Sequence, residues 1–400
     1  MLIIVQKYGG SSVADPDKIK KIAGLISNIK NEGFDVAVVV SAMGKTTDSL
    51  LELAKQVSDE PQKRELDMLL STGERITMSL LCMALNNLGI DSVSLTGSQA
   101  GIITNDRHND ARVIEIRPFR VLDELEKGRV VVVGGFQGVS YRRDITTLGR
   151  GGSDTTAVAL AASLNAERCE IYSDVDGVFS ADPSVVKDAK HLPEISFEQM
   201  QEMSEAGAKV LNAQAVQFAK EANIAIYARS TFQQGRETIV RKFPAGLSKG
   251  VKAVVYENYI SRIEFFYNGN EKSISLLSFL EKRQIPVKEF NYSSVENGNK
   301  ISFLISQKNI YNEDKLETEL EAEFGDCMKI EHDLGTVSLI GDGINKDNTI
   351  LLETLSILQK EKFKISGVAT TSFRISFLLD NSFVKKTVLL CHNRWIGEKV

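Results

Sequence analysis

Cysteine and histidine are scarce in this 400-residue sequence, which contains four of each. The four cysteines lie far apart and form no C-x-x-C pair, and the histidines are equally scattered: Cys82, Cys169, Cys327, Cys391, His108, His191, His332 and His392. A disulfide framework or a zinc site needs several such residues at close spacing. We therefore predict no disulfide framework and no resident metal ion, and we expect a reducing compartment, the cytoplasm.

Basic tracts and long apolar runs are also missing. The net charge is -5 at pH 7 with no basic cluster, which argues against a nucleic-acid partner. The first residues, MLIIVQKYGG, have no basic region and only a short apolar run, so we expect no signal peptide. No stretch is expected to span a membrane. The overall composition, with 42% hydrophobic and 25% charged residues, is typical of a soluble globular protein. The length of 400 residues is enough for two or three domains.

Residues 1–245 alternate short β-branched runs with longer helical patterns, which predicts a layered α/β domain. Strands are expected at Leu2–Lys7, Val36–Ser41, Ser92–Leu95, Val130–Gly134, Glu170–Ser173 and Ile224–Arg229. Helices are expected at 16–31, 62–88, 155–164 and 196–221. The first of these helices should start with Asp15 as its N-cap and Pro16 at its first position.

The pattern changes beyond residue 245, where Phe243–Gly246 reads as a linker. Two units of about 65 residues follow, each with the order strand, helix, strand, strand, helix. The first unit is expected to contain Arg262–Tyr267, Glu271–Arg283, Val287–Tyr292, Lys300–Gln307 and Glu313–Phe324. The second unit is expected to contain Thr336–Ile340, Asn348–Glu361, Lys364–Thr371, Arg374–Leu379 and Ser382–Cys391. This order indicates two ferredoxin-like βαββαβ halves, which are either structural or regulatory.

Two glycine-rich loops are the strongest candidates for a phosphate site. Lys7–Val13, with the sequence KYGGSSV, joins the first strand to the first helix, where glycines let backbone N–H groups approach phosphate oxygens. Lys7 would neutralise charge on a transferred group. Gly149–Ala157, with the sequence GRGGSDTTA, precedes an apolar helix and concentrates anion-binding groups at its N-terminus. Arg150 offers two parallel N–H groups to a carboxylate, and Asp154 would either hold Lys7 or help to coordinate Mg²⁺.

Three further segments are less specific. Ser41–Asp48 contains GKT but has Val39 where a P-loop needs glycine, so it is not a P-loop. Glu74, in the segment STGER, would matter if it received a substrate ammonium group. Ser173–Pro183 follows a strand and suits either an aspartate-rich cation loop or a nucleotide contact.

No Ser–His–Asp set, Cys–His set or dinucleotide fingerprint occurs in the sequence. Phosphoryl transfer does not need one, because it depends mainly on positioning and on charge neutralisation. A carboxylate acceptor is already ionised at neutral pH, so no strong general base is required. The glycine loops, lysines and arginine are therefore sufficient for such a reaction.

Taken in order, the segments KYGGSSV, SAMGKTTD, STGER, GRGGSDTTA and SDVDGVFSADP resemble the aspartokinase branch of the amino acid kinase family. The resemblance covers nearly all of residues 1–245. The two later units resemble that family's paired ACT domains, most clearly at Thr371–Ser376. This family resemblance implies a catalytic domain at 1–245, a linker and first ACT unit at 246–332, and a second ACT unit at 333–400. The implied fold is a layered α/β sandwich with a mainly parallel central sheet, followed by the two ferredoxin-like units.

The resemblance also implies a function: phosphorylation of the side-chain carboxylate of L-aspartate by ATP with Mg²⁺, the first step towards lysine, threonine and methionine. Lys7 would stabilise the transferring phosphoryl group and Asp154 would organise Lys7. Glu74 would bind the aspartate ammonium and Arg150 its α-carboxylate. The substrate site would also include Ser41, Thr47, Phe136 and Ser153. The nucleotide site would include Lys7, Gly9, Gly10, Ser11, Gly151, Gly152, Ser173, Asp174, Phe179, Asp182 and Lys209. The chain would form a homodimer or larger homo-oligomer through its ACT units.

The sequence departs from the family pattern at several positions. Phe179 and Ser184 replace the usual Tyr and Arg of the nucleotide loop, and Asn212-Ala213 replaces His-Pro. Both ACT units lack the Pro-Gly loop before their first helix, with Asn270–Ser273 in one and Asp347–Ile350 in the other. The missing Pro-Gly loops put feedback control by lysine or threonine in doubt. Two alternatives to an active aspartate kinase stay open: a catalytically silent ACT-type regulator that binds nucleotide or amino acid, and a related kinase with another carboxylate acceptor, such as glutamate or acetylglutamate.

Overall fold

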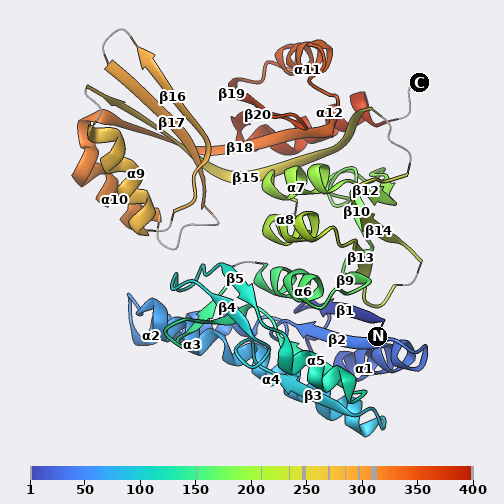
Figure 1. Cartoon of the computed structure of the whole chain (residues 1–400). Coiled ribbons are helices and arrows are strands. Elements are labelled where there is room, and N and C mark those ends of the chain that lie inside the picture. Colours follow the sequence, from blue (N-terminus) through green and yellow to red (C-terminus); the bar gives the residue numbers. More distant parts are fainter. Residues whose placement is uncertain are drawn as a thin grey trace. The chain divides into compact units, whose positions relative to one another are not determined.

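A computed structural model describes residues 2–149, 151–208, 210–233, 235–245, 249–268, 271–283, 285–295, 298–307 and 313–397 (Figure 1). The chain forms two compact units. The first unit comprises Met1–Val178, His191–Glu205 and Lys209–Leu247. The second unit comprises Phe179–Lys190, Ala206–Ala208 and Ser248–Val400. The second unit therefore takes two short segments from the region before residue 245.

An eight-stranded sheet forms the centre of the first unit, in the order β12-β14-β13-β9-β1-β2-β6-β3. Every described pairing in it is parallel except that of β13 with β14. The strands are β1 (Ile3–Tyr8), β2 (Asp35–Val40), β3 (Ser92–Leu95), β6 (Val130–Gly134), β9 (Arg168–Ser173), β12 (Glu194–Ile195), β13 (Ile226–Ser230) and β14 (Glu237–Val240). All five residues of β6 and five of the six in β2 are buried, because helices cover both faces of the sheet.

Helices lie on the two sides of this sheet, with α6 on one side of β1 and β2 and with α1 and α4 on the other (Figure 1). The helices of the unit are α1 (Pro16–Asn31), α2 (Thr46–Val57), α3 (Lys63–Leu70), α4 (Thr72–Asn87), α5 (Phe119–Glu126), α6 (Gly152–Ser163), α7 (Phe197–Glu205) and α8 (Ala213–Ala222). The predicted start of α1 is confirmed: Asp15 accepts a hydrogen bond from the Lys18 N–H, and Pro16 occupies the first turn. Helix α6 is buried along its length from Gly152 to Ala161, so it lies inside the unit.

A second, four-stranded sheet in the first unit was not predicted. Its order is β5-β4-β7-β8, and its strands are β4 (Ile102–Thr104), β5 (Val113–Ile116), β7 (Gln137–Ser140) and β8 (Ile145–Thr147). These strands have only three or four residues, and several of their buried side chains are polar and pair with each other. Thr104 and Thr146, for example, have hydroxyl oxygens 2.6 Å apart. Short β10 (Val178–Phe179) and β11 (His191–Leu192) pair separately.

The second unit is built on one six-stranded sheet, in the order β16-β17-β15-β18-β20-β19. Its elements are β15 (Gly250–Tyr267), α9 (Glu271–Arg283), β16 (Lys288–Val295), β17 (Gly298–Ser306), α10 (Glu313–Phe324), β18 (Met328–Asp342), α11 (Thr349–Lys360), β19 (Ile365–Thr370), β20 (Arg374–Asp380) and α12 (Val384–Trp395). The two long central strands, β15 and β18, pair with each other along most of their length, so both ferredoxin-like halves share them. The predicted boundary at 332/333 falls within β18.

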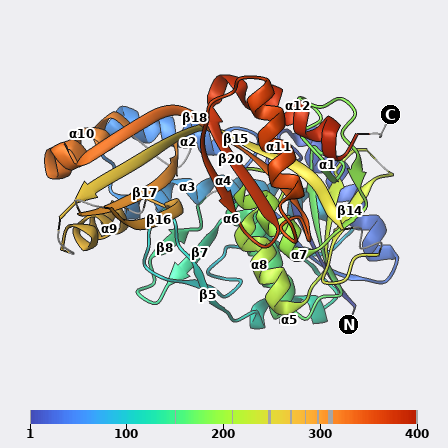
Figure 2. The ribbon, with the colours of Figure 1, turned by 90° about the horizontal axis from the view of Figure 1, so that it is seen from above.

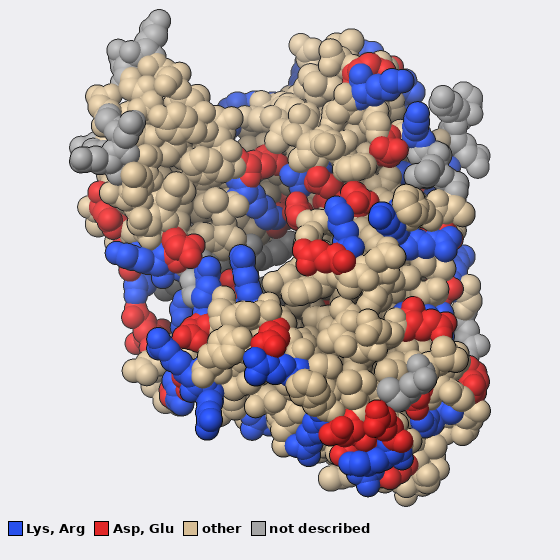
Figure 3. Space-filling model, viewed as in Figure 1, with Lys and Arg blue, Asp and Glu red and all other residues tan. Residues whose placement is uncertain are grey.

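Each half of this sheet has its own hydrophobic core. Helices α9 and α10 cover one half around Phe265, Leu276 and Phe303. Helices α11 and α12 cover the other half around Val337, Phe377 and Val388. Figure 2 shows the two helix pairs separated along the sheet. On the face shown in Figure 3, the described acidic and basic side chains are interspersed, in keeping with the small net charge.

Two predicted helices are each broken in two. The 62–88 helix is interrupted at Ser71, between α3 and α4, and the 196–221 helix is interrupted between α7 and α8. Gly207 has a φ of +111°, outside the helical region, and the Asn212 side chain caps α8.

One helical stretch meets the length and composition of a membrane span, although no membrane span was expected from the sequence. Among the described residues, Lys63–Asn87 is long and apolar enough to cross a membrane. Half of that stretch is buried inside the unit, and it carries two buried carboxylates, Asp67 and Glu74. Both features are typical of a core helix of a folded domain.

Candidate active site

Lys7 and Asp154 form an ion pair in the first unit, with 2.6 Å between Lys7 Nζ and Asp154 Oδ1. Lys7 is at the carboxyl end of β1, and Asp154 is in the first turn of α6. Both side chains are only 11% exposed. Since α6 packs on β1, the sheet and the helix fix the ammonium in one place, beside a helix N-terminus that itself attracts anions.

The turn after β1 brings two backbone segments unusually close together. The Gly44 N–H donates to the Gly10 carbonyl, and a Cβ at Gly10 would lie 3.0 Å from the Ala42 carbonyl oxygen. A Cβ at Gly9 would lie 3.4 Å from Lys7 Nζ. Side chains at these two positions would therefore crowd the ammonium and the neighbouring loop, which is why glycine suits both positions.

Glu74 is buried near the N-terminus of α4, with 2% of its surface exposed. One carboxylate oxygen, Oε1, accepts a hydrogen bond from the Ala42 N–H at 3.1 Å. The other oxygen, Oε2, is buried and has no hydrogen-bond partner among the described residues. Burial raises the pKa of Glu74 to about 7, although hydrogen bonds from backbone N–H groups oppose that shift. A buried acceptor without a hydrogen-bond partner costs free energy, so a ligand that donates a hydrogen bond to Oε2 would bind favourably there.

The loop after β6 contacts the start of α6. Phe136 has a φ of +64°, uncommon for a non-glycine residue, and its N–H donates to Thr156 Oγ1 at 3.2 Å. A Cβ at Gly135 would lie 2.8 Å from Ser153 Oγ, and one at Gly152 would lie 3.0 Å from the Phe136 ring. Phe136, Ser153 and Gly152 are thus neighbours, as the predicted substrate wall requires.

Ser41 and Thr47 follow β2, the strand next to β1. The Ser41 N–H donates to the Tyr8 carbonyl at 3.1 Å, which places Ser41 beside the end of β1. Thr47 is in the first turn of α2 and is partly buried. Both hydroxyl groups are therefore on the carboxyl side of the parallel strands, where ligands of open α/β sheets bind.

The predicted nucleotide segment after β9 adjoins the glycine turn through backbone contacts. The Gly9 N–H donates to the Tyr172 carbonyl at 3.1 Å, one residue before Ser173. Thr231 joins the two segments: its hydroxyl oxygen lies 2.6 Å from Ser12 Oγ, and its N–H donates to the Ser173 carbonyl at 2.9 Å. Apart from its place directly after a strand, nothing in the sequence pattern singles out Thr231.

The other predicted residues fall outside this group. Phe179 and Asp182 belong to the second unit, where Asp182 accepts hydrogen bonds from Ser184 and from the Tyr256 hydroxyl. Asp174 is exposed. Arg150 and Lys209 lie outside the described residues. By contrast, Ser11 and Gly151 lie in the two glycine turns, Ser11 directly after Gly10 and Gly151 directly before α6.

The charges of this group suit phosphoryl transfer to a carboxylate. A fixed ammonium and two glycine turns offer positive charge and N–H groups to phosphate oxygens, while Glu74 offers an acceptor to an ammonium group. Within the described ranges no group of three His, Cys, Asp or Glu side chains is arranged to bind a metal ion. Mg²⁺ in kinases is usually bound by one or two carboxylates together with nucleotide phosphates, so a group of three such side chains is not required for it.

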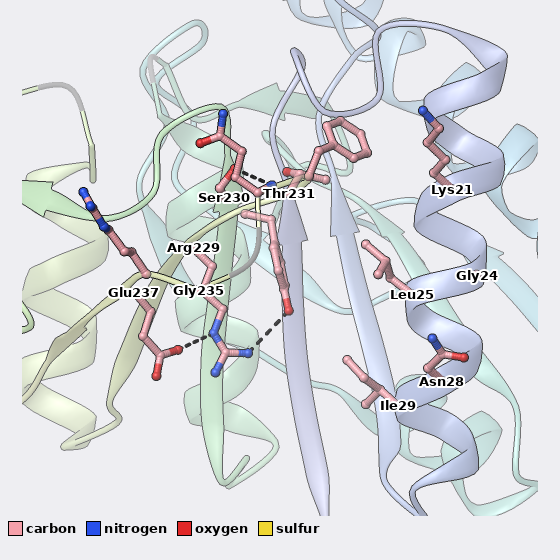
Figure 4. A pocket seen from close by; sticks show the side chains of 14 residues that line it. Lys21, Gly24, Leu25, Asn28, Ile29, Arg229, Ser230, Thr231, Gly235 and Glu237 are labelled. Carbon is pink, nitrogen blue, oxygen red and sulfur yellow. Dashed lines mark hydrogen bonds and ion pairs between the residues drawn. The ribbon is translucent and has the colours of Figure 1, made fainter.

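A pocket of about 810 Å³ lies between one face of α1 and the residues around β13 and β14, and its lining includes Tyr172 and Thr231 (Figure 4). Arg229 on its floor pairs with Glu237 at 2.6 Å and with Glu170 at 2.8 Å, so its charge is already balanced. None of the predicted site residues lines this pocket.

The sequence comparison identifies the class of protein. Residues 2–230 match the amino acid kinase family, so the chain belongs to this family of phosphotransferases. The resemblance to its aspartokinase branch is also confirmed. The aspartokinase of Mycolicibacterium smegmatis is 40% identical over 98% of this chain and 96% of its own length. Aspartokinase 2 of Bacillus subtilis is 40% identical over 98% of this chain and 97% of its own length.

The fold comparison confirms the predicted fold class. The crystal structure of Escherichia coli aspartokinase III in complex with aspartate and ADP covers 99% of this chain and 100% of its own, with a TM-score of 0.83 and 24% identity. It therefore supports the α/β architecture with a mainly parallel central sheet and additional β-sheet domains.

Proposed function

We propose that this chain transfers the γ-phosphoryl group of ATP to the side-chain carboxylate of L-aspartate, giving ADP and 4-phospho-L-aspartate. Support comes from its similarity to aspartokinases over 98% of its length and from a structural neighbour that binds aspartate and ADP. The observation that carries the proposal is Glu74, a buried carboxylate with one oxygen lacking a partner among the described residues. An amino acid substrate brings an ammonium group for that oxygen.

The reaction follows from these charges. A carboxylate oxygen of aspartate attacks the γ-phosphorus, a new P–O bond forms, and the bond to the β,γ-bridging oxygen breaks to release ADP. Lys7 neutralises the charge that develops on the phosphoryl oxygens, and Asp154 holds Lys7 in place. Arg150 binds the α-carboxylate, while Ser41, Thr47, Phe136 and Ser153 complete the substrate site. Ser173, Asp174, Phe179, Asp182 and Lys209 contact the nucleotide.

Three finer features belong to the same proposal. Mg²⁺ would accompany ATP and would supply positive charge that offsets the negative charge of the phosphates. The chain acts in the cytoplasm. It forms a homodimer or larger homo-oligomer through the sheet of the second unit, whose edge strands β16 and β19 can pair with strands of a second chain.

An acceptor screen tests the proposal. The purified chain is incubated with ATP, Mg²⁺ and one of L-aspartate, L-glutamate or N-acetyl-L-glutamate, and ADP release is followed by a coupled assay. Trapping with hydroxylamine confirms that an acyl phosphate has formed. We expect turnover with aspartate alone: N-acetylglutamate has no ammonium group for Glu74, and glutamate places its side-chain carboxylate one methylene farther from its ammonium group, out of line with the phosphoryl group. Turnover with another acceptor, or none with any, would overturn the proposal in favour of a different kinase or a silent regulator.

A further inference from the structure

Asp67 is a completely buried carboxylate that has no role in the proposed reaction. It lies in α3 with 0% of its surface exposed. Its Oδ1 accepts hydrogen bonds from the Thr147 hydroxyl at 2.5 Å and from the Asn109 N–H at 3.0 Å. Its Oδ2 lies 2.6 Å from His108 Nδ1. One side chain therefore connects three segments that are distant in the sequence.

The first of these connections leads to the loop before α6. Thr147 is the last residue of β8, two positions before Gly149, where the turn into α6 begins. The next residue, Leu148, donates its N–H to the Phe136 carbonyl at 2.9 Å. By holding Thr147, Asp67 thus fixes Leu148 and Gly149, which lie shortly before Ser153 at the start of α6, and it does so beside Phe136.

The second connection supports the same loop from its other side. His108 and Asn109 belong to the connection between β4 and β5. In this connection the Ala111 N–H donates to the Thr147 carbonyl at 2.9 Å. A Cβ at Gly149 would lie 3.1 Å from Asp110 Oδ1 and 3.4 Å from the Asn109 carbonyl, so the two loops pack closely.

The third connection is the helix that carries Asp67 itself. Helix α3 leads through Ser71 directly into α4, where Glu74 lies seven residues after Asp67. The Gln137 side-chain amide donates to the Ser71 carbonyl at 3.1 Å, which fixes this junction against β7. Any movement of α3 relative to β8 would therefore change the distance between Glu74 and the loop that begins α6.

We propose that Asp67 is a positioning residue for the amino acid substrate: through Thr147, His108 and Asn109 it sets Leu148 and Gly149, and with them the start of α6 at Gly152 and Ser153, relative to Glu74. This inference rests on the proposed function, in which Glu74 binds the ammonium group and Ser153 belongs to the substrate site. A buried carboxylate is costly, and burial raises the pKa of Asp67 while hydrogen bonds from Thr147, His108 and Asn109 lower it. An apolar side chain would fill the same space more cheaply but could not hold three donors in fixed directions.

The test compares Asp67→Ala and Asp67→Asn with Thr147→Val, using steady-state kinetics for aspartate and ATP. We expect Asp67→Ala to raise the KM for aspartate by ~10-fold or more, since small displacements of binding groups are this costly, while the KM for ATP stays within about 2-fold. Asp67→Asn keeps the size of the side chain and one acceptor oxygen, so it should raise the KM for aspartate less than Asp67→Ala does. Thr147→Val should raise the KM for aspartate in the same direction.

Arg64→Ala is the matched control, because Arg64 connects the same two elements at their exposed ends. Its Nε donates to Asp144 Oδ1 at 2.8 Å, just before β8. We expect this variant to keep the wild-type KM for aspartate. A lower melting temperature for the Asp67 variants with an unchanged KM would show a purely structural role and overturn the inference.

A failure of the proposed function can be distinguished from a failure of the positioning role of Asp67. If the wild-type enzyme uses another acceptor, the acceptor found in the screen replaces aspartate as the varied substrate. A KM for that acceptor unaffected by Asp67→Asn and Thr147→Val would still reject the positioning role. These two isosteric variants keep the test decisive if Asp67→Ala does not fold.

Discussion

Lys7 owes its position to two elements rather than to its own loop. It ends a buried strand, and Asp154 on α6 holds its ammonium at 2.6 Å. Because both side chains are largely buried, the charge is kept where water screens it poorly and where it acts most strongly on a phosphate group. A lysine on a flexible loop would have to lose side-chain entropy on each turnover.

Lys7→Ala should lower kcat by at least ~10³-fold, as expected for loss of a phosphate-neutralising cation. The variant should still fold, because the strand keeps its apolar residues, although Asp154 then lacks its partner and some stability is lost. Coupled ADP release measures the rate, and circular dichroism checks the fold. Lys20→Ala, on the exposed face of α1, is the control and should have wild-type kinetics. Near-normal turnover by Lys7→Ala would remove Lys7 from the mechanism.

Glu74 illustrates a conflict between stability and function. Its pKa is about 7 in the folded chain against 4.5 as the ordinary value, so the folded state binds more protons than the unfolded state between these two pH values. Stability from this group is therefore present below pH 4.5 and is lost as the pH rises through 7. At pH 8 the ionised, buried carboxylate costs up to ~3 kcal/mol of the free energy of unfolding.

Glu74→Gln should accordingly raise the stability at pH 8, by up to ~3 kcal/mol, and have little effect at pH 4.5. The same change should abolish aspartate binding, because an uncharged amide cannot balance a buried ammonium group. Urea denaturation at the two pH values and calorimetric titration with aspartate measure these effects. Glu52→Gln, at an exposed position on α2, should change neither property. A Glu74→Gln protein that is less stable than wild type at pH 8 would contradict the burial argument.

At the scale of elements, the proposed substrate wall depends on how closely β6 approaches α6. Gly135 follows β6, and a Cβ there would lie 2.8 Å from Ser153 Oγ and 2.9 Å from Val39 Cγ1. Gly24, in the middle of α1, is the opposite case, since a Cβ there would have nothing within 4 Å. These two glycines therefore provide a matched pair.

Gly135→Ala should destabilise the chain by ~1–3 kcal/mol, the usual result of overpacking, and should raise the KM for aspartate by displacing Ser153. Gly24→Ala should stabilise the chain by ~0.5–1 kcal/mol, because alanine favours a helix interior, and should leave the kinetics unchanged. Denaturation midpoints and steady-state kinetics of the two variants decide the matter. Equal effects of both substitutions on KM would show that the β6–α6 contact is unimportant for substrate binding.

The success of sequence-based prediction also varied by element. The ends of β1, β2, β6 and β9 were predicted within about two residues, since buried parallel strands are continuous apolar runs. The start of α1 was predicted because its cap is local chemistry. The break at Ser71 was missed because long-range packing accompanies it: a Cβ at Gly73 would lie 2.8 Å from Ala42 Cβ, a contact that the sequence of one helix cannot reveal.

In the candidate site, too, local motifs were recognised from the sequence and long-range contacts were not. Lys7, Glu74 and Asp154 were proposed from motifs. The pairing of Lys7 with Asp154 was one of the two roles expected of Asp154, and the structure adds the oxygen of Glu74 that has no partner among the described residues. Asp67 was missed because its partners are 41, 42 and 80 residues away. Its one sequence signal is an acidic residue on the apolar face of a helix.

At the scale of the whole molecule, two of the residues proposed to contact the nucleotide, Phe179 and Asp182, belong to the second unit. Ala181 and Val186, on either side of Asp182 in the chain, are buried in the core around α11 and α12. The Val254 N–H donates to the Ser180 carbonyl at 2.7 Å, and the Tyr256 hydroxyl donates to Asp182. A change in the sheet of this unit would therefore move Asp182 directly.

Regulation by an amino acid effector at that sheet would depend on the loops that precede helices α9 and α11. Asn270 lies outside the described residues, so the second loop carries the structural argument. There, Asp347 Oδ1 accepts the Thr349 N–H at 2.9 Å, at the first residue of α11, and hydrogen bonds from Thr349 lower the pKa of Asp347. The Asn345 amide donates to the carbonyls of Thr371 and Arg374. A carboxylate thus already occupies an N–H group that an effector's carboxylate would need.

We therefore expect weak or no inhibition by lysine and threonine, alone or together. An effector changes activity only if it binds the two states of the enzyme with different affinity, and an anionic effector approaching α11 would meet the negative charge of Asp347. Activity is measured with each amino acid and with both across the millimolar range, and calorimetry of the same mixtures distinguishes a lost site from lost coupling. Asp347→Gly frees the Thr349 N–H and should increase effector affinity if this loop is the site. Inhibition of the wild-type enzyme at micromolar lysine or threonine would show that the loop still binds its effector, through groups other than the Thr349 N–H.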